Sequence, residues 1–136
     1  MKVEALKRTS LFADLTRKQL TELAKVTEDV DVAAGKVLCE QGRRGEEFFL
    51  IMEGEVEVTR AGEKLATFGS GDFFGEIALV EDVPRTATVT ARTPLRFFVL
   101  TRRNFLRLLD EQPGLEREVM RALARRLASA SDDPRL

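Results

Sequence analysis

The strongest constraint on the fold is a change in the spacing of apolar residues near Val30. Before that point apolar residues recur at helical spacing, behind a Thr16–Gln19 segment whose threonine and glutamine are typical of a helix start. After it, apolar and polar residues alternate as they do in strands, until helical spacing returns beyond Leu100. The chain is therefore expected to form a β structure with helices before and after it.

Glycines and polar turns divide the alternating region into short strands. Ala61 and Gly62 are typical of a two-residue hairpin turn, and Phe48–Met52 is an apolar run that predicts a strand buried on both faces. Expected strands cover residues 30–32, 36–40, 47–53, 55–59, 64–68, 86–91 and 95–100, with a short helical turn at 76–80. This pattern predicts an α+β protein built on an antiparallel β-roll, with N-terminal helices and two C-terminal helices.

The length of 136 residues is enough for one hydrophobic core. We expect a single domain over residues 1–136, with lead-in helices at about 5–27, the β-roll at about 28–101 and the closing helices at about 102–130. Thr101 is expected to cap the first closing helix, and Pro113 suits the start of the second.

Composition excludes several classes of function. The sequence has no histidine and one cysteine, so neither a usual zinc site nor a serine or cysteine hydrolase with an imidazole base can be assembled. We therefore expect no catalytic residues and no metal, although an all-carboxylate metal site or a two-carboxylate hydrolase stays formally open. The net charge of −1 gives no reason to expect nucleic-acid binding.

No apolar run approaches the roughly 18 residues that a membrane helix needs. The first eight residues lack the apolar core of a signal peptide and already carry Glu4. We therefore expect a cytoplasmic protein without a membrane segment. Cys39, in the apolar run Val37–Cys39, is interpreted as a small buried side chain rather than a reactive thiol. The arginines that crowd the last third of the chain are interpreted as a solvated face rather than a binding patch.

The most informative segment runs from Gly71 to Ala87. Gly75 removes a side chain where a short helix begins, so a ligand can approach the backbone there, and the amides of Ile77 and Ala78 suit a phosphate. Arg85 follows the next loop, and its guanidinium can bridge two phosphate oxygens. This segment therefore predicts an anion site.

Glu76 is unexpected in an anion site, because a carboxylate repels phosphate. Its presence makes sense if the ligand also offers a hydroxyl donor. A ribose 2′-OH beside a phosphate is such a ligand, with the carboxylate accepting from the sugar while Arg85 and the amides hold the phosphate.

Two sequence runs in this segment, Phe74–Leu79 (FGEIAL) and Pro84–Ala87 (PRTA), resemble the phosphate-binding cassette of the cyclic nucleotide-binding domain family. That family includes bacterial catabolite activators, cyclic-nucleotide-gated channels and protein kinase A regulatory subunits. Gly42, Gly54 and Gly71 fall where the family has turn glycines, and the terminal helices resemble its lead-in, hinge and lid helices. The resemblance covers roughly residues 5 to 130.

The resemblance implies a regulatory domain that binds a cyclic nucleotide, with cAMP as the expected ligand, cGMP as the alternative, no cofactor and no catalysis. The implied ligand-binding residues are Gly75, Glu76, Ile77, Ala78, Arg85, Thr86 and Ala87. Because family members selective for cGMP commonly have a hydroxyl at the position of Thr86, that residue leaves cGMP open. The resemblance also implies that Val58 and Leu65 contact the base or sugar and that Arg126 on the lid helix is a possible second phosphate contact.

The expected partners are the cyclic nucleotide and either a downstream effector protein or a missing output domain. The chain lacks the helix-turn-helix of the catabolite activators, so direct DNA binding is not expected. Met120, Leu123, Leu127 and Ala130 lie at the spacing of a dimer seam, but they suit packing on the β-roll equally well, so we expect a monomer or a weak homodimer.

Less specific interpretations stay open beside these. Glu76 and Arg85 could form only a structural ion pair, and Thr86 could be an ordinary strand threonine. Phe73 and Phe74 are interpreted as core residues, and Arg126 as solvated. At the level of function, the alternatives are a structural interaction domain with a degenerate pocket and a cupin-like enzyme, although cupins usually bind metal through histidines.

Overall fold

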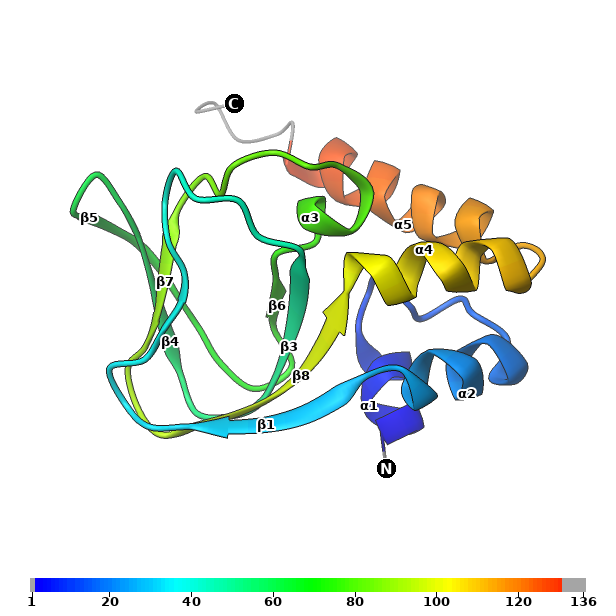
Figure 1. Ribbon diagram of the computed structural model, residues 1–136, viewed down its shortest axis with the longest axis horizontal. Coiled ribbons are helices and arrows are strands. Elements are labelled where there is room, and N and C mark those ends of the chain that lie inside the picture. The colour runs from blue at the N-terminus through cyan, green and yellow to red at the C-terminus, as the bar shows by residue number, and fades with distance from the viewer. Residues whose placement is uncertain (1, 131–136) are drawn as a thin grey trace. The chain divides into compact units, whose positions relative to one another are not determined.

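The computed structural model describes residues 2–130, excluding the side chains of residues 126, 127, 129 and 130. The chain divides into two compact units, one formed by Val26–Leu106 and the other by the described residues up to Lys25 and from Arg107 onward. The strands are β1 (Glu28–Val32), β2 (Val37–Cys39), β3 (Glu47–Glu53), β4 (Val56–Arg60), β5 (Glu63–Phe68), β6 (Phe73–Phe74), β7 (Thr88–Ala91) and β8 (Leu95–Thr101) (Figure 1). The helices are α1 (Lys2–Arg8), α2 (Arg17–Lys25), α3 (Ile77–Val80), α4 (Arg102–Glu111) and α5 (Leu115–Ala130).

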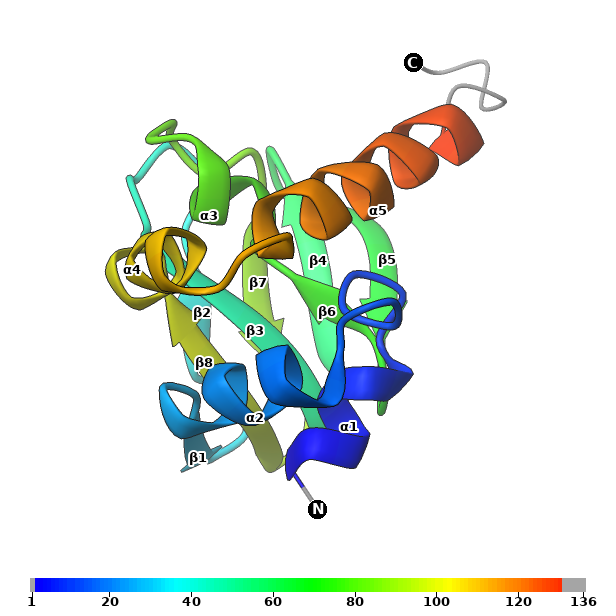
Figure 2. The same ribbon diagram turned by 90° about the vertical axis from the view of Figure 1, so that its right-hand side faces the viewer.

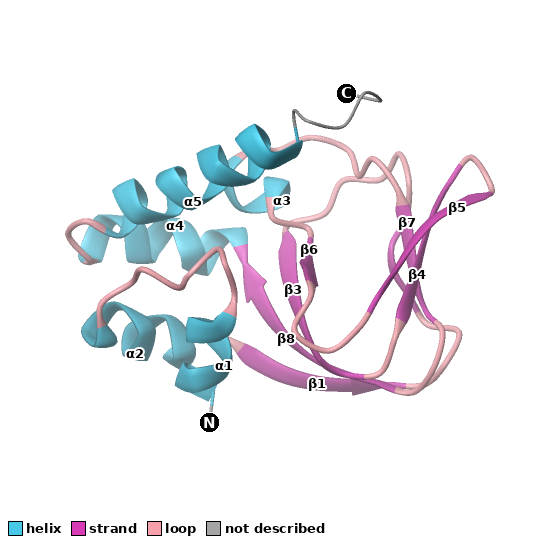
Figure 3. Cartoon of the chain, turned by 180° about the vertical axis from the view of Figure 1, so that it is seen from behind, coloured by secondary structure: helices cyan, strands magenta, loops and turns pink. Residues whose placement is uncertain are grey.

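The strands of the 26–106 unit form two four-stranded sheets. One has the order β1-β8-β3-β6 and the other β2-β7-β4-β5, with every strand pair antiparallel. Seen from behind in Figure 3, β4, β5 and β7 lie on one side of this unit and β1, β3, β6 and β8 on the other. The predicted α+β class with an antiparallel β-roll is confirmed. The single-domain organisation over residues 1–136 stays a prediction.

The core of this unit lies between the inward faces of the two sheets. In β3, all four residues from Phe48 to Ile51 are buried, as the apolar run predicted. Phe49 stacks on Phe74 with ring centroids 4.7 Å apart, and Phe97 meets the same Phe49 ring edge-on at 5.5 Å. The interpretation of Phe74 as a core residue is thus confirmed, and its neighbour Phe73 is also buried. These aromatic contacts hold β3 in place within the core, and with it the loops that precede and follow β3.

The predicted hairpin turn is present between β4 and β5. Ala61 and Gly62 both have positive φ, at 52° and 83°. That combination is the signature of a type I′ turn, whose twist matches that of the flanking strands. Arg60 and Glu63 face each other as the first pair of the hairpin. The turn therefore fixes the direction in which β4 ends.

In the helical unit, α2 begins with the predicted capping pair (Figure 2 shows α1 and α2). The Gln19 amide donates to the Thr16 hydroxyl at 3.1 Å, and the Thr16 amide donates to the Gln19 side chain at 2.9 Å. The Gln19 side chain also donates to the Pro113 carbonyl at 2.8 Å, just before α5. Gln19 therefore links the start of α2 to the start of α5.

The two closing helices agree with those predicted from the sequence, except for the start of the second one. Thr101 accepts from the Asn104 amide at 3.2 Å and caps α4 as predicted. The prediction that Pro113 begins the last helix is wrong, because α5 begins at Leu115 after the positive-φ Gly114. On α5, Met120 is exposed and Leu123 is half-buried, while the side chains of Leu127 and Ala130 lie outside the description. Among the described helices, none is both long and apolar enough to cross a membrane.

Candidate functional site

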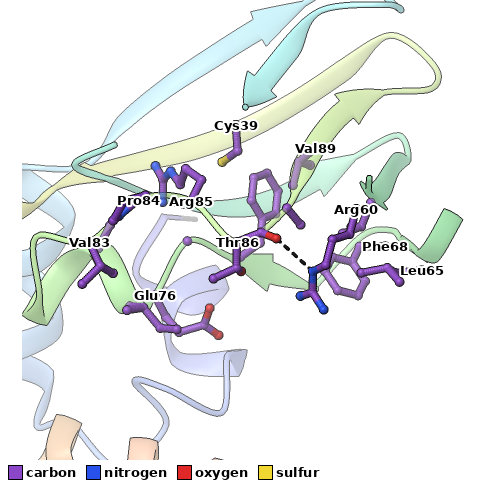
Figure 4. Close-up of a pocket in the computed structure, with 16 residues that line it drawn as sticks. Cys39, Arg60, Leu65, Phe68, Glu76, Val83, Pro84, Arg85, Thr86 and Val89 are labelled. Carbon is purple, nitrogen blue, oxygen red and sulfur yellow. Dashed lines mark hydrogen bonds between the residues drawn. The ribbon is translucent and has the colours of Figure 1, made fainter. Parts of the chain in front are cut away.

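A cavity of about 200 Å³ opens in the 26–106 unit, beside the segment that the sequence analysis singled out (Figure 4). Gly75, Glu76, Ile77 and Ala78 contribute to it from the start of α3. Arg85, Thr86 and Ala87 contribute from the segment that leads into β7. The remaining lining residues are Cys39, Val58, Arg60, Leu65, Phe68, Phe74, Val83, Pro84 and Val89. Every residue proposed for the β-roll part of the site therefore lies on one cavity.

Arg85 is held by both its backbone and its side chain. Its amide donates to the Arg43 carbonyl at 2.8 Å, and its carbonyl accepts from the Gly42 amide at 2.9 Å. The guanidinium donates through Nη2 to the Glu47 carbonyl at 2.9 Å and lies 5.9 Å from the centre of the Phe49 ring. Backbone bonds to one loop and a side-chain bond to the start of β3 together limit the positions that the cation can take.

Two glycines make room for this guanidinium. At Gly75, which has φ +81°, a Cβ would lie 2.6 Å from the Glu47 carbonyl oxygen and 3.1 Å from Arg85 Nη1. At Gly45, a Cβ would collide with the Nε and Nη2 atoms and the central carbon of the same side chain. Gly75 was predicted from the sequence to allow ligand access, whereas the role of Gly45 was not predicted. A loop glycine carries no local sign that an arginine forty residues later will lie against it.

Glu76 and the amides of α3 lie at the same cavity. Glu76 is half-buried, whereas 52% of the Ile77 surface is exposed. The Ala78 amide donates to the Gly75 carbonyl at 3.1 Å, so a ligand that used this amide would share or replace that bond. Because α3 has only four residues, its contribution is that of individual amides rather than of a helix dipole.

Arg85 differs from other arginines of this unit in its ion pairing. Neighbouring arginines have acidic partners: Arg44 lies 3.1 Å from Asp82, and Arg102 lies 2.9 Å from Glu46. Among the described residues, by contrast, no carboxylate forms an ion pair with Arg85. The alternative that Glu76 and Arg85 form a structural ion pair is therefore not supported by the described residues. A half-buried guanidinium without a counter-ion suits an anionic ligand.

The far wall of the cavity comes from the β2-β7-β4-β5 sheet. Val58 on β4 is 8% exposed, and Leu65 on β5 is 45% exposed at the edge of the cavity. Thr86 is exposed and lines the cavity beside half-buried Ala87. The proposed second phosphate contact, Arg126, lies outside the residues whose side chains are described.

Sequence reasoning missed Arg60 and the apolar residues around it. The Arg60 Nε donates to the carbonyl of Thr86 at 2.9 Å, which brings the end of β4 against the segment before β7 (Figure 4). Phe68, Val83 and Val89 complete the apolar lining. No short motif contains these residues, because strand pairing brings them together from distant parts of the chain.

Cys39 lines the cavity as a buried side chain, as expected. Burial raises the pKa of the Cys39 thiol from an ordinary 9.0 to about 11, the nearby Arg85 guanidinium lowers that pKa, and Glu47 raises it. The thiol is therefore protonated at neutral pH. Within residues 2–130, no group of three or more Cys, Asp or Glu side chains is placed to hold a metal ion.

Comparison with known proteins connects this geometry to a family. The model of the family described as "Cyclic nucleotide-binding domain" matches residues 29–112, which include all of the cavity lining. A cAMP-dependent protein kinase regulatory subunit from Yarrowia lipolytica is 41% identical over 106 residues, covering 76% of this chain and 28% of the relative. A cGMP-dependent protein kinase from Caenorhabditis briggsae is 34% identical over 123 residues, covering 85% of this chain and 16% of the relative.

A solved structure agrees with these matches. The N-terminal domain of a transcriptional regulator from Streptomyces coelicolor A3(2) superimposes with a TM-score of 0.84 at 32% identity, covering 94% of this chain and 93% of that one. The chain spans less than a third of the length of the two kinase relatives. The family match covers more than half of the 136 residues and includes strands β2 to β8, the cavity and the cassette segment. The chain therefore belongs to the cyclic nucleotide-binding domain family.

Proposed function

We propose that this domain is a receptor that binds a purine 3′,5′-cyclic nucleotide at the Arg85 cavity and performs no chemistry on it. The observation that carries the proposal is the half-buried Arg85, which lines the cavity and has no ion-pair partner among the described residues. A cyclic phosphodiester carries one negative charge, so it neutralises this cation without leaving a second charge to compensate.

Each part of the nucleotide has a matching group in the lining. Arg85 binds the phosphate oxygens, and the amides of Ile77 and Ala78 add donors. The Glu76 carboxylate accepts a hydrogen bond from the ribose 2′-OH. The apolar side chains of Val58 and Leu65 contact the base or sugar. This division of roles explains why an acid and an arginine line the same small cavity.

We take cAMP as the expected ligand, because the 41% identical relative is a cAMP-dependent kinase subunit. A specific observation favours cGMP as a second candidate: the Thr86 residue lines the cavity and provides a hydroxyl group. The hydroxyl can accept a hydrogen bond from the 2-amino group of guanine, a donor that adenine lacks.

The domain acts as a regulatory module of a soluble cytoplasmic protein, as a monomer or a weak homodimer. Binding neutralises Arg85, shifts α3 and changes the position of the closing helices, which an effector protein or an output domain then reads. Such a switch requires the open and closed forms to bind the nucleotide with unequal affinity.

Calorimetric titration with cAMP, cGMP and 5′-AMP tests the proposal. We expect saturable binding of at least one cyclic nucleotide and much weaker binding of 5′-AMP, because its open phosphate carries a second charge that Arg85 alone does not balance. The absence of heat with both cyclic nucleotides at high micromolar concentration, supported by an unchanged melting temperature, would refute the proposal.

A further inference from the structure

The cavity is lined by a second arginine, Arg60, in addition to Arg85. Arg60 is the last residue of β4 and lines the cavity together with Leu65 and Phe68. Figure 4 shows these three side chains at one end of the cavity and Arg85 with Pro84 toward the other. Its Nε donates to the Thr86 carbonyl at 2.9 Å. That bond limits the rotation of an otherwise exposed guanidinium.

The other donors of Arg60 are available to a ligand. Its Nε bond to Thr86 uses one of the five N–H donors of the guanidinium. Among the described residues, the two Nη atoms donate to no acceptor and Arg60 takes part in no ion pair, although Glu63 is its partner across the hairpin. The carboxylate in the lining, Glu76, belongs to the α3 side of the cavity.

The placement of Arg60 and Arg85 toward opposite ends of the cavity indicates which part of a ligand reaches Arg60 (Figure 4). This step rests on the proposed function, in which the phosphate lies at Arg85. Besides the two arginines, much of the lining is apolar and includes Val58, Ala87 and Val89, which suits the faces of a purine ring. A nucleotide that extends from Arg85 along this lining presents the edge of its base to Arg60.

We propose that Arg60 binds the edge of the purine base through its Nη atoms and raises the affinity for cGMP relative to cAMP. Guanine presents two adjacent acceptors, O6 and N7, which match the paired donors of a guanidinium. Adenine presents one acceptor, N7, beside the N6 amino group, which is a donor and opposes an arginine N–H. Arg60 is thus a specificity-determining residue at the base end of the site.

The test compares cGMP, cAMP and 7-deaza-cGMP, which lacks the N7 acceptor, on the full chain and on three variants. The variants are Arg60→Gln, Arg60→Lys and, as a matched control, Arg92→Gln, an exposed arginine outside the cavity. Arg60→Gln is expected to weaken cGMP about tenfold and cAMP less than about threefold, as loss of one two-bond base contact implies. Arg60→Lys keeps the charge but cannot form the paired bonds, so it does not restore cGMP.

The analogue separates a base contact from an effect of charge. The wild-type chain is expected to bind 7-deaza-cGMP more weakly than cGMP, and Arg60→Gln is expected to remove most of that difference. An equal loss for cAMP and cGMP, restored by lysine, would overturn the inference and leave the proposed function intact, as would unchanged affinities in Arg60→Gln. A wild-type chain that binds neither nucleotide would overturn the proposed function and the inference with it.

Discussion

At the scale of single residues, the position of the Arg85 guanidinium depends on two neighbouring glycines that have no side chain. Gly45 and Gly75 leave the space that its Nε and Nη atoms occupy, and the Glu47 carbonyl accepts its Nη2 bond. The central carbon of the guanidinium lies 5.9 Å from the centre of the Phe49 ring. Because these contacts come from three segments, a small change in any of them moves the cation without unfolding the chain.

Gly45 offers a way to move the cation alone. In Gly45→Ala the new methyl group displaces the Arg85 guanidinium, because the three atoms nearest to it all belong to the Arg85 side chain. We expect cyclic-nucleotide affinity to fall about tenfold or more while the free energy of unfolding changes by less than about 1 kcal/mol. Gly69→Ala, whose new Cβ would meet only the Gly54 carbonyl at 3.9 Å, serves as the control. Unchanged affinity in Gly45→Ala would mean that Arg85 does not need its present position.

Cys39 gives the domain a measurable dependence on alkaline pH. Burial raises the pKa of its thiol from 9.0 to about 11 in the folded chain. Between pH 9 and pH 11 the unfolded chain loses the thiol proton and the folded chain keeps it. The contribution of Cys39 to the free energy of unfolding is therefore fully present below pH 9 and is lost as the pH rises toward 11. Unfolding in urea at several pH values should show a loss of at most about 3 kcal/mol that is absent in Cys39→Ala. Parallel pH profiles for the two proteins would show that Cys39 is not protected in this way.

At the scale of elements, the cavity is a product of strand pairing. Its walls come from β2, β4, β5 and β7 on one side and from the α3 segment on the other. The β4–β5 hairpin directs Arg60 toward the cavity, because the type I′ turn at Ala61 and Gly62 fixes where β4 ends. The conformation of this turn therefore sets the position of Arg60, the residue proposed to determine the choice of base.

The turn itself is open to improvement. Ala61 has φ 52°, a conformation that costs a residue with a Cβ roughly 1–2 kcal/mol. Ala61→Gly relieves this strain, and we expect the free energy of unfolding to rise by about 1 kcal/mol with nucleotide affinity unchanged, as measured by urea unfolding and titration. Gly62→Ala, at φ 83°, should have the opposite effect on stability. If Ala61→Gly destabilised the chain, its effect on the flexibility of the unfolded state would outweigh the relief of strain.

The sequence predicted elements better than it predicted the cavity. The capping pair of α2, the β3 run and the hairpin all follow from residues that are neighbours in the chain, and these predictions are confirmed. Gly45 and Arg60 acquire their roles only through contacts with residues far away in the sequence, at Arg85 and Thr86. Glu76 and Arg85 could be named as candidates because they lie within one motif.

At the scale of the whole molecule, the domain is nearly neutral, with a net charge of −1. Long-range attraction therefore contributes little, and recognition depends on the local charges of the cavity. The boundary between the two compact units falls within α4, which begins at Arg102 in one unit and ends at Glu111 in the other. A ligand that binds only the folded form of the unit containing the cavity stabilises that unit.

Binding should therefore be visible in the melting temperature of the whole chain. At a free nucleotide concentration 100 times Kd, stabilisation is about 2.7 kcal/mol. For a chain of this size we expect the Tm to rise by about 5–10 °C. The rise should depend on nucleotide concentration and be much smaller with 5′-AMP at the same concentration. Equal shifts with all nucleotides would indicate nonspecific stabilisation instead.

The most direct test of the account is the affinity of Arg85→Ala for the preferred cyclic nucleotide, measured by calorimetry beside the wild-type chain and Arg92→Ala. Removing the cation leaves the phosphate without its charge partner, so we expect a loss of about 3 kcal/mol or more, at least a hundredfold in Kd. Arg92→Ala, outside the cavity, should bind as the wild type does. An Arg85→Ala chain that keeps wild-type affinity would contradict the account.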